Sequence, residues 1–160
     1  MPAFCGQDDC LLDANGRVKL SPRMLEDFQQ ASAGRVVLRC LPEGAIGVYP
    51  PEVFERMRQA ESGIAAAGES LLSRRRMRMF GAFSEDARIS PQGRITVPPP
   101  FREHAGLRPG EDICVIGVEI GAEIWSRKAW IAEREILKQH WEARGEAEMA
   151  GDIANLRGSL

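Results

Sequence analysis

Arg17 and Arg94 each follow directly on a glycine in this 160-residue chain. A guanidinium carries its N–H donors in a planar fork, which can read the edge of guanine in a DNA major groove or pair with a carboxylate. Asp13 stands four residues before Arg17, close enough across a turn to accept a hydrogen bond or to orient the guanidinium. Ser90 occupies the corresponding position before Arg94. The two arginines are therefore either base readers or partners in ion pairs that only fix a turn.

Further polar side chains lie close to these two arginines in the sequence. Cations and hydroxyls in such places can bind phosphates, which position a protein on DNA without specifying the sequence. The alternative for each of them is an ordinary solvated surface position. These residues are Lys19, Arg23, Thr96 and Arg102.

The densest basic run comprises Arg74, Arg75, Arg76 and Arg78. It favours two interpretations equally. The run could clamp phosphates, or it could pair with acidic residues of the same or a neighbouring subunit.

The overall charge predicts no particular partner. With 21 basic and 23 acidic residues, the formal net charge is -2, so no global basic field indicates a nucleic acid. The sequence contains no signal peptide and no long apolar run, which favours a cytoplasmic location without a membrane. Any binding to nucleic acid must come from a local patch.

Metal and enzyme chemistry are not supported by the residue spacing. The four cysteines include no C-x-x-C pair, and the chain has two histidines, so we expect no metal site and no cofactor. His104, His140 and Ser90 form no recognisable nucleophile and base pattern with an acid partner. We therefore expect no enzymatic activity and no small-molecule substrate. The cysteines are Cys5, Cys10, Cys40 and Cys114.

The sequence repeats itself after 77 positions. The shift places "NGRVKL" on "QGRITV", so that Arg17 falls on Arg94, and it places Val36 on Ile113. After one deleted residue the match resumes with Tyr49 on Trp125. Such self-similarity predicts two copies of one supersecondary plan.

Each copy predicts the order strand, strand, short helix, strand, strand, helix. The segments "LLDANGRVKL" and "RISPQGRITV" alternate around a turn and predict a hairpin. A short helix beginning near Pro22 or Pro99 follows each hairpin, because proline fits the first helical turn. Two more strands follow, and then a helix, over about 51–59 in the first copy and 126–144 in the second.

This plan divides the chain into four parts. We expect a first repeat over residues 1–60, a connecting helix within 61–79, a second repeat with its C-terminal helix over 80–144, and a flexible tail over 145–160. Aromatic residues recur at the junctions between strand and helix, which favours packing in the core or at a subunit interface over stacking on bases. These aromatics are Tyr49, Phe54, Trp125 and Trp130.

The two copies resemble the MraZ family of bacterial transcriptional regulators. The pattern is D-x-x-x-R followed by an alternating apolar strand, a proline and a short helix, seen in "LDANGRVKL" and "RITVPPPFR". The likeness covers about residues 4 to 143. Ser90 departs from the pattern in the second copy, and Ser21 departs from it in the first.

The resemblance implies an α+β fold in which the tandem repeat forms a swapped-hairpin β-barrel of the AbrB type, with short flanking helices. It also implies a homo-oligomer larger than a dimer, a ring of several subunits that binds double-stranded DNA at short repeated sites beside division and cell-wall genes. We expect a nucleoid-associated repressor whose DNA-binding residues are Arg17, Arg94, Asp13, Lys19, Arg23, Thr96 and Arg102.

Two other functions stay open. A ring-forming structural or interaction protein could keep the barrel and lose specific DNA binding, and the departures at Ser90 and Ser21 favour this alternative. An AbrB-like antitoxin is the third possibility, although such proteins are usually half this length.

Overall fold

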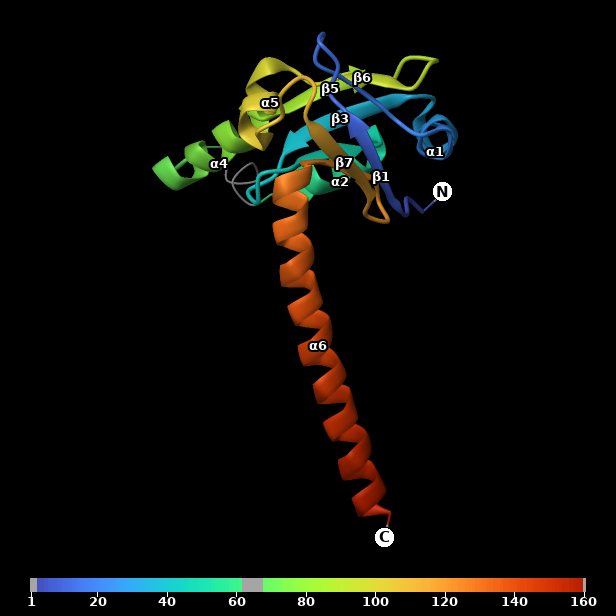
Figure 1. The fold of residues 1–160 in the computed structure, drawn as a ribbon. Helices are drawn as coiled ribbons and strands as arrows, with labels where there is room; N and C mark the ends of the chain where they lie inside the picture. The colour runs from blue at the N-terminus through green and yellow to red at the C-terminus, as the bar shows by residue number, and fades with distance from the viewer. Residues whose placement is uncertain (1–2, 62–67, 160) are drawn as a thin grey trace. The chain divides into compact units, whose positions relative to one another are not determined.

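A computed structural model describes residues 3–61 and 68–159 of the chain (Figure 1). The chain divides into two compact units, Met1–Arg127 and Lys128–Leu160, which are described separately. All the described strands of both repeats fall within the first unit.

The element order of the first unit follows the predicted plan twice. The first repeat supplies β1 (Gln7–Leu11), β2 (Arg17–Lys19), α1 (Pro22–Ser32), β3 (Arg35–Cys40), β4 (Ile46–Tyr49) and α2 (Pro51–Ala60). The second repeat supplies β5 (Ser84–Arg88), β6 (Arg94–Thr96), α5 (Pro99–Ala105), β7 (Asp112–Gly117) and β8 (Ala122–Ser126), after which α6 begins at Arg127. The predicted order and the α+β class are thereby confirmed.

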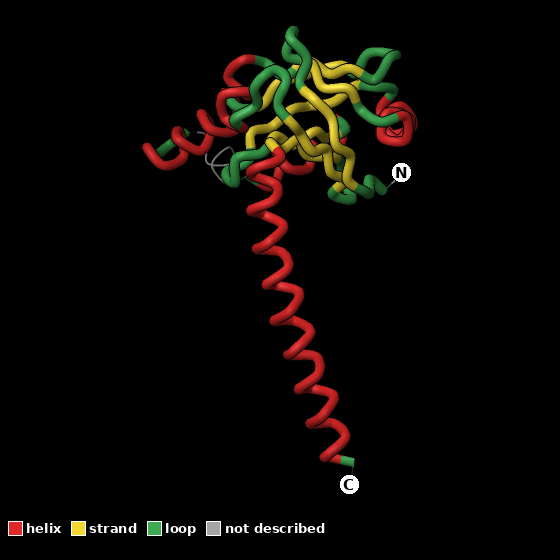
Figure 2. Tube along the Cα trace, viewed as in Figure 1, coloured by secondary structure: helices red, strands yellow, loops and turns green. Residues whose placement is uncertain are grey.

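The strands are exchanged between the repeats. One sheet has six strands in the order β1-β7-β8-β4-β3-β5, and every pair in it is antiparallel. The first strand of each repeat thus pairs with the third strand of the other repeat, while the equivalent strands β4 and β8 meet in the middle. The equivalent strands β2 and β6 form a separate two-stranded ribbon. Figure 2 shows these strands gathered in yellow.

The predicted local hairpins are correct in their turns, and Leu12 forms an antiparallel bridge with Val18 across the first one, but the named strands on either side of each turn do not pair with each other. Each turn is closed by backbone hydrogen bonds, including Gly16 N to the Asp13 carbonyl at 3.0 Å and Gly93 N to the Ser90 carbonyl at 2.8 Å. The strands on either side of the turn then enter different sheets. In the described part of the chain the six-stranded order ends at β1 and at β5, so hydrogen-bonded strands do not close into a barrel.

The core is built from both repeats. Its main cluster contains Val18 and Ile95 of the ribbon, both fully buried, together with apolar residues of β3, β4, β7 and β8. A smaller cluster joins Tyr49, Phe54 and Phe80. All four recurring aromatics are buried, Trp125 and Trp130 included, which agrees with packing and not with exposed stacking platforms.

In the described residues between the repeats, α4 (Leu71–Ala82) lies close to the expected position of the connecting helix. Ser70 caps it by accepting a hydrogen bond from the Ser73 backbone N–H at 3.0 Å. Part of the predicted connecting segment, residues 62–67, lies outside the described residues.

The second unit consists of most of α6 (Arg127–Gly158). The expected end near residue 144 is wrong, because residues 145–158, expected to form a flexible tail, are helical. A glycine costs a helix about 1 kcal/mol relative to alanine. Strong helix formers surround Gly145, and Arg144 pairs with Glu148 at 3.0 Å across it. None of the helices in the described residues is long and apolar enough to span a membrane.

Candidate nucleic-acid interface

The β2–β6 ribbon brings the two glycine-arginine stretches together. The register places Arg17 opposite Thr96 and Lys19 opposite Arg94. Side chains alternate along a strand, and Val18 and Ile95 are fully buried, so these four polar residues share the other face. Three cations and a hydroxyl therefore occupy one face of a short two-stranded ribbon.

Backbone hydrogen bonds extend the ribbon beyond its three paired residues. Val97 N donates to the Gly16 carbonyl at 2.9 Å, and Leu20 N donates to the Gly93 carbonyl at 2.8 Å. Each turn is thereby tied to the strand of the other repeat. Backbone hydrogen bonds therefore join the two turns to the ribbon, whose other face is buried in the core.

Asp13 organises the first turn. Its Oδ1 accepts hydrogen bonds from the backbone N–H of Asn15 at 2.8 Å and of Arg17 at 2.9 Å. Its Oδ2 accepts one from the Arg17 Nε at 3.0 Å. The Arg17 backbone N–H, followed by the other donors, lowers the pKa of the Asp13 carboxyl below its usual range. One carboxylate thus fixes both the turn and the direction of the Arg17 side chain.

The second turn lacks this carboxylate. Ser90 Oγ accepts a hydrogen bond from the Arg94 backbone N–H at 3.0 Å, so the turn itself is kept. A single hydroxyl offers no second oxygen to the guanidinium, and no described residue forms an ion pair with Arg94. Asp13 therefore orients the Arg17 guanidinium, whereas no carboxylate of the described residues does so for Arg94.

Arg102 of α5 packs against the first turn. A Cβ built on Gly16 would lie 2.9 Å from the Arg102 Cζ, so the guanidinium occupies the space that a side chain at residue 16 would need. The Arg102 Nε is buried without a hydrogen-bond partner among the described residues. In the second turn Leu25 takes the equivalent place beside Gly93. Arg102 therefore brings a further cation to the first turn, next to Arg17.

Arg23 is directed elsewhere. Its guanidinium lies 3.5 Å from the Asp8 carboxylate and donates to the Cys5 carbonyl. Ser21 Oγ also donates to Asp8, at 2.8 Å, and caps α1 by accepting from Met24 N. The sequence grouped Arg23 with the ribbon cations, but its contacts are with the segment that precedes the first turn.

Two exposed amides at the turn tips were missed by the sequence analysis. Asn15 and Gln92 stand immediately before the two glycines, and both are exposed. The signal that could have found them is the repeat itself, because the 77-residue shift places one amide on the other. A side-chain amide can bind the edge of adenine in the major groove.

Similar proteins carry the name MraZ. Residues 86–150 match the family described as "MraZ protein, putative antitoxin-like". A protein of Syntrophobacter fumaroxidans named Transcriptional regulator MraZ is 30% identical over 88% of this chain and 91% of its own length. A protein of Paenarthrobacter aurescens with the same name is 35% identical over 79% of this chain and 83% of its own.

A solved structure is also aligned with the chain. It is titled "The solution structure of PHS018 from pyrococcus horikoshii" and covers 76% of this chain and 96% of its own, at 14% identity and a TM-score of 0.34. A likeness this low carries no argument about fold or function.

Proposed function

Because this chain belongs to the MraZ family, we propose that it is a transcriptional regulator that binds double-stranded DNA through the polar face of the β2–β6 ribbon. The observation that carries the proposal is the register, which sets Arg17 beside Thr96 and Lys19 beside Arg94 on one exposed face. The relatives with the family name are called transcriptional regulators.

The shape of the ribbon suits a major groove. B-DNA admits a two-stranded β-ribbon there, and each base pair presents a distinct pattern of donors and acceptors. Arg17 is already oriented by Asp13, which makes it the best-prepared reader of guanine. Asn15 and Gln92 at the turn tips are candidates for reading adenine.

The remaining cations have a positioning role in this proposal. Arg94 lacks a carboxylate partner, so a phosphate can supply its counter-charge. Lys19, Arg102 and the Thr96 hydroxyl supply further phosphate contacts on either side. Arg23 is left with a structural role, since Asp8 already neutralises it.

We also propose that several copies of the chain associate with one another. One ribbon presents few base contacts, and the formal net charge of -2 gives no general attraction to DNA. A homo-oligomer larger than a dimer would place several ribbons along repeated sites and multiply their affinities. In this proposal the exchange of strands between the two repeats corresponds to the swapped-hairpin arrangement. The regulator would repress a division and cell-wall gene cluster.

The test is selection of bound sequences from random duplexes, followed by titration of Arg17→Ala and Arg94→Ala. Losing Arg17 should cost on the order of 1–3 kcal/mol per guanine contact and relax specificity. Losing Arg94 should weaken binding to the selected and scrambled sites alike and reduce its salt dependence. Equal loss of specificity in both variants, or none in a folded Arg17→Ala oligomer, would contradict the assignment.

The second candidate is a structural or interaction protein that has lost specific DNA binding. Ser90 favours it, because the second turn no longer holds its arginine. Under this alternative the selection enriches no sequence, and duplex DNA is not bound at low salt.

A further inference from the structure

Two arginines lie directly opposite each other where β3 begins and β5 ends. The register of these strands pairs Arg35 with Arg88, and both residues are exposed. Residues paired in this way stand on the same face of a sheet with Cβ atoms about 4.5–5.5 Å apart, and like charges placed so destabilise the pairing. In the described part of the chain, neither guanidinium forms an ion pair or a hydrogen bond. The backbone therefore holds two cations together without a carboxylate bound to either.

The other repeat does not have this pair of cations. The 77-residue shift places Arg35 on Asp112 and Arg88 on Leu11. Leu11 and Asp112 pair with each other in the same way between β1 and β7. The two sides of the sheet share one backbone plan but carry different side chains at this position. The fold by itself thus does not require two opposed arginines.

A cavity of about 380 Å³ is lined by both of these arginines. Pro51, the first residue of α2, and Asp86 of β5 line it as well. No side chain caps the start of α2, so the backbone N–H groups of its first turn have no intrahelical acceptor and carry a partial positive charge. Asp86 forms no ion pair with the described residues, whereas its repeat equivalent Asp9 pairs with Arg127 at 3.0 Å. Two guanidiniums and a helix start outweigh the single carboxylate, so the cavity favours an anion.

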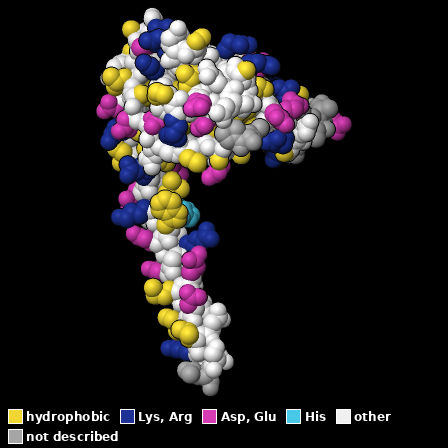
Figure 3. Space-filling model, turned by 90° about the vertical axis from the view of Figure 1, so that its right-hand side faces the viewer, with side chains coloured by type: hydrophobic (Ala, Val, Ile, Leu, Met, Phe, Trp, Pro, Cys, Tyr) yellow, Lys and Arg dark blue, Asp and Glu magenta, His cyan; other side chains and the backbone are white. Residues whose placement is uncertain are grey.

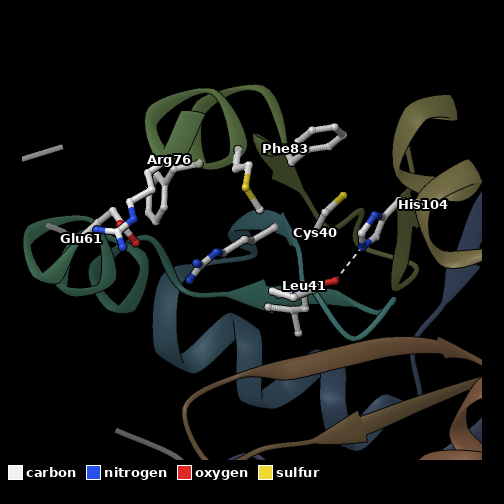
Figure 4. Close-up of a pocket in the computed structure, with 10 residues that line it drawn as sticks. Cys40, Leu41, Glu61, Arg76, Phe83 and His104 are labelled. Atoms are coloured by element: carbon white, nitrogen blue, oxygen red, sulfur yellow. Dashed lines mark hydrogen bonds between the residues drawn. The ribbon is translucent and has the colours of Figure 1, made fainter. Parts of the chain in front are cut away.

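A second cavity, of about 400 Å³, adjoins the other end of β3 and differs in its polar groups (Figure 4). His104 Nε2 is hydrogen-bonded to the Leu41 carbonyl at 2.7 Å. The Arg39 guanidinium lies 4.8 Å from the centre of the Phe80 ring, and Arg76 also has a partner. These groups interact within the chain, which distinguishes them from the opposed arginines of the first cavity.

The residues of the first cavity indicate the chemical class of the anion. On the face of the molecule that Figure 3 shows, Lys and Arg side chains are interspersed with acidic ones, so the attraction has to come from a local site. A guanidinium binds phosphate through two parallel hydrogen bonds, and two guanidiniums on neighbouring strands can share the oxygens of one phosphate group. The volume lies in the range of small-molecule pockets, about 300–1,000 Å³, which leaves room for an organic group beside the phosphate.

We propose that Arg35 and Arg88 bind the phosphate group of a small phosphate monoester in this cavity. The Asp86 carboxylate would accept a hydrogen bond from a hydroxyl of the organic part. This site is separate from the DNA-binding ribbon. Val36 and Leu38, which alternate with the outward residues of β3, are buried in the same cluster as the ribbon, so Arg35 lies on the other face of the sheet.

Calorimetry on the full chain in a phosphate-free buffer tests the site, with glycerol 3-phosphate as the probe and glycerol as its uncharged control. The unmodified chain should bind glycerol 3-phosphate saturably at one site per chain, should not bind glycerol, and should show competition by inorganic phosphate. Arg35→Gln and Arg88→Leu should each raise the Kd about tenfold or more, because each removes a charged hydrogen-bond donor. Leucine is chosen at residue 88 because Leu11 occupies the equivalent strand position.

The matched control is Arg108→Gln, since Arg108 is exposed and lines neither of these cavities. It should bind the probe as the unmodified chain does. Glycerol 3-phosphate should raise the melting temperature of the unmodified chain and of this control, but not that of Arg88→Leu. Without the probe, Arg88→Leu should melt no lower than the unmodified chain, because no group of the protein loses a partner.

The outcomes distinguish a small molecule from DNA as the source of the phosphate. Lack of saturable binding by the unmodified chain, unchanged binding in folded Arg35→Gln and Arg88→Leu, or an equal loss in the control overturns the site. If the arginines instead contact the DNA backbone, glycerol 3-phosphate is not bound and both variants weaken binding to selected and scrambled duplexes alike, which also overturns it. The measurement is independent of the ribbon, because Arg17→Ala should bind the probe as the unmodified chain does.

Discussion

Replacing Asp13 with serine would give the first turn the chemistry of the second. The Ser90 hydroxyl shows that serine can still accept from the backbone N–H of the following arginine, at 3.0 Å. The hydrogen bond from the Arg17 Nε to the Asp13 Oδ2, also 3.0 Å, would be lost. Asp13→Ser therefore should keep the turn and release the Arg17 guanidinium.

The expected effect is on binding more than on folding. The Arg17 and Asp13 side chains are 39% and 38% exposed, and exposed ion pairs contribute little to stability. Holding one long side chain in its bound conformation is worth roughly 0.5–1.5 kcal/mol. The affinity for a selected site should therefore fall about twofold to twelvefold for each engaged copy. Where two copies bind together, the losses multiply.

Fluorescence anisotropy on the selected and the scrambled duplex measures this effect. Asp13→Ser should reduce the ratio of the two affinities, because only the selected site uses the oriented guanidinium. Ser90→Asp is the matched reverse change, and it should leave specificity unchanged or raise it by giving Arg94 a carboxylate partner. A folded Asp13→Ser oligomer with an unchanged affinity ratio would refute the orienting role.

Three further outcomes follow from the turns and the thiols. The pKa of the Asp13 carboxyl is lowered, so the stability contributed by its ionised form is present above the unfolded pKa and is lost only as pH falls through the lower folded pKa. The factor by which Asp13→Ser weakens binding to the selected site should therefore be the same at pH 8 and pH 5.5. A clear change in this factor between the two pH values would contradict the lowered pKa. Gly16→Ala should lower the melting temperature more than Gly44→Ala. Both need a left-handed φ, but only the new Cβ at residue 16 would lie 2.9 Å from a guanidinium carbon. Iodoacetamide at pH 7.5 should label exposed Cys5 before Cys40, whose pKa burial raises to about 11, and equal labelling by mass spectrometry would count against that burial.

The sequence alone determined the elements of each repeat. Turn residues before Arg17 and Arg94, prolines at the first helical turn, and alternating apolar residues are local signals, and each acts within a few residues of the structure it specifies. The repeat made these signals more reliable because each pattern occurred twice. The same comparison indicated buried aromatics at the junctions, as Tyr49 and Trp125 show.

The end of α6 was a failure of local reasoning. Gly145 is a helix-weakening residue, and the sequence near it suggested a flexible tail. Propensity is a sum over many residues, and the helix formers on both sides of Gly145 outweigh its cost. The continuation of the helix to Gly158 was therefore not predicted from the sequence.

Only the tertiary structure decided which strands pair. Strand pairing uses backbone N–H and C=O groups that are alike in every residue, so a strand's sequence does not name its partner. The strand β1 could have paired with β2 across its own turn, but it pairs with β7, and β2 pairs with β6. The path of the whole chain and burial of one shared core settle that choice. This exchange places Lys19 opposite Arg94 and makes one polar face from residues 75 positions apart in the sequence.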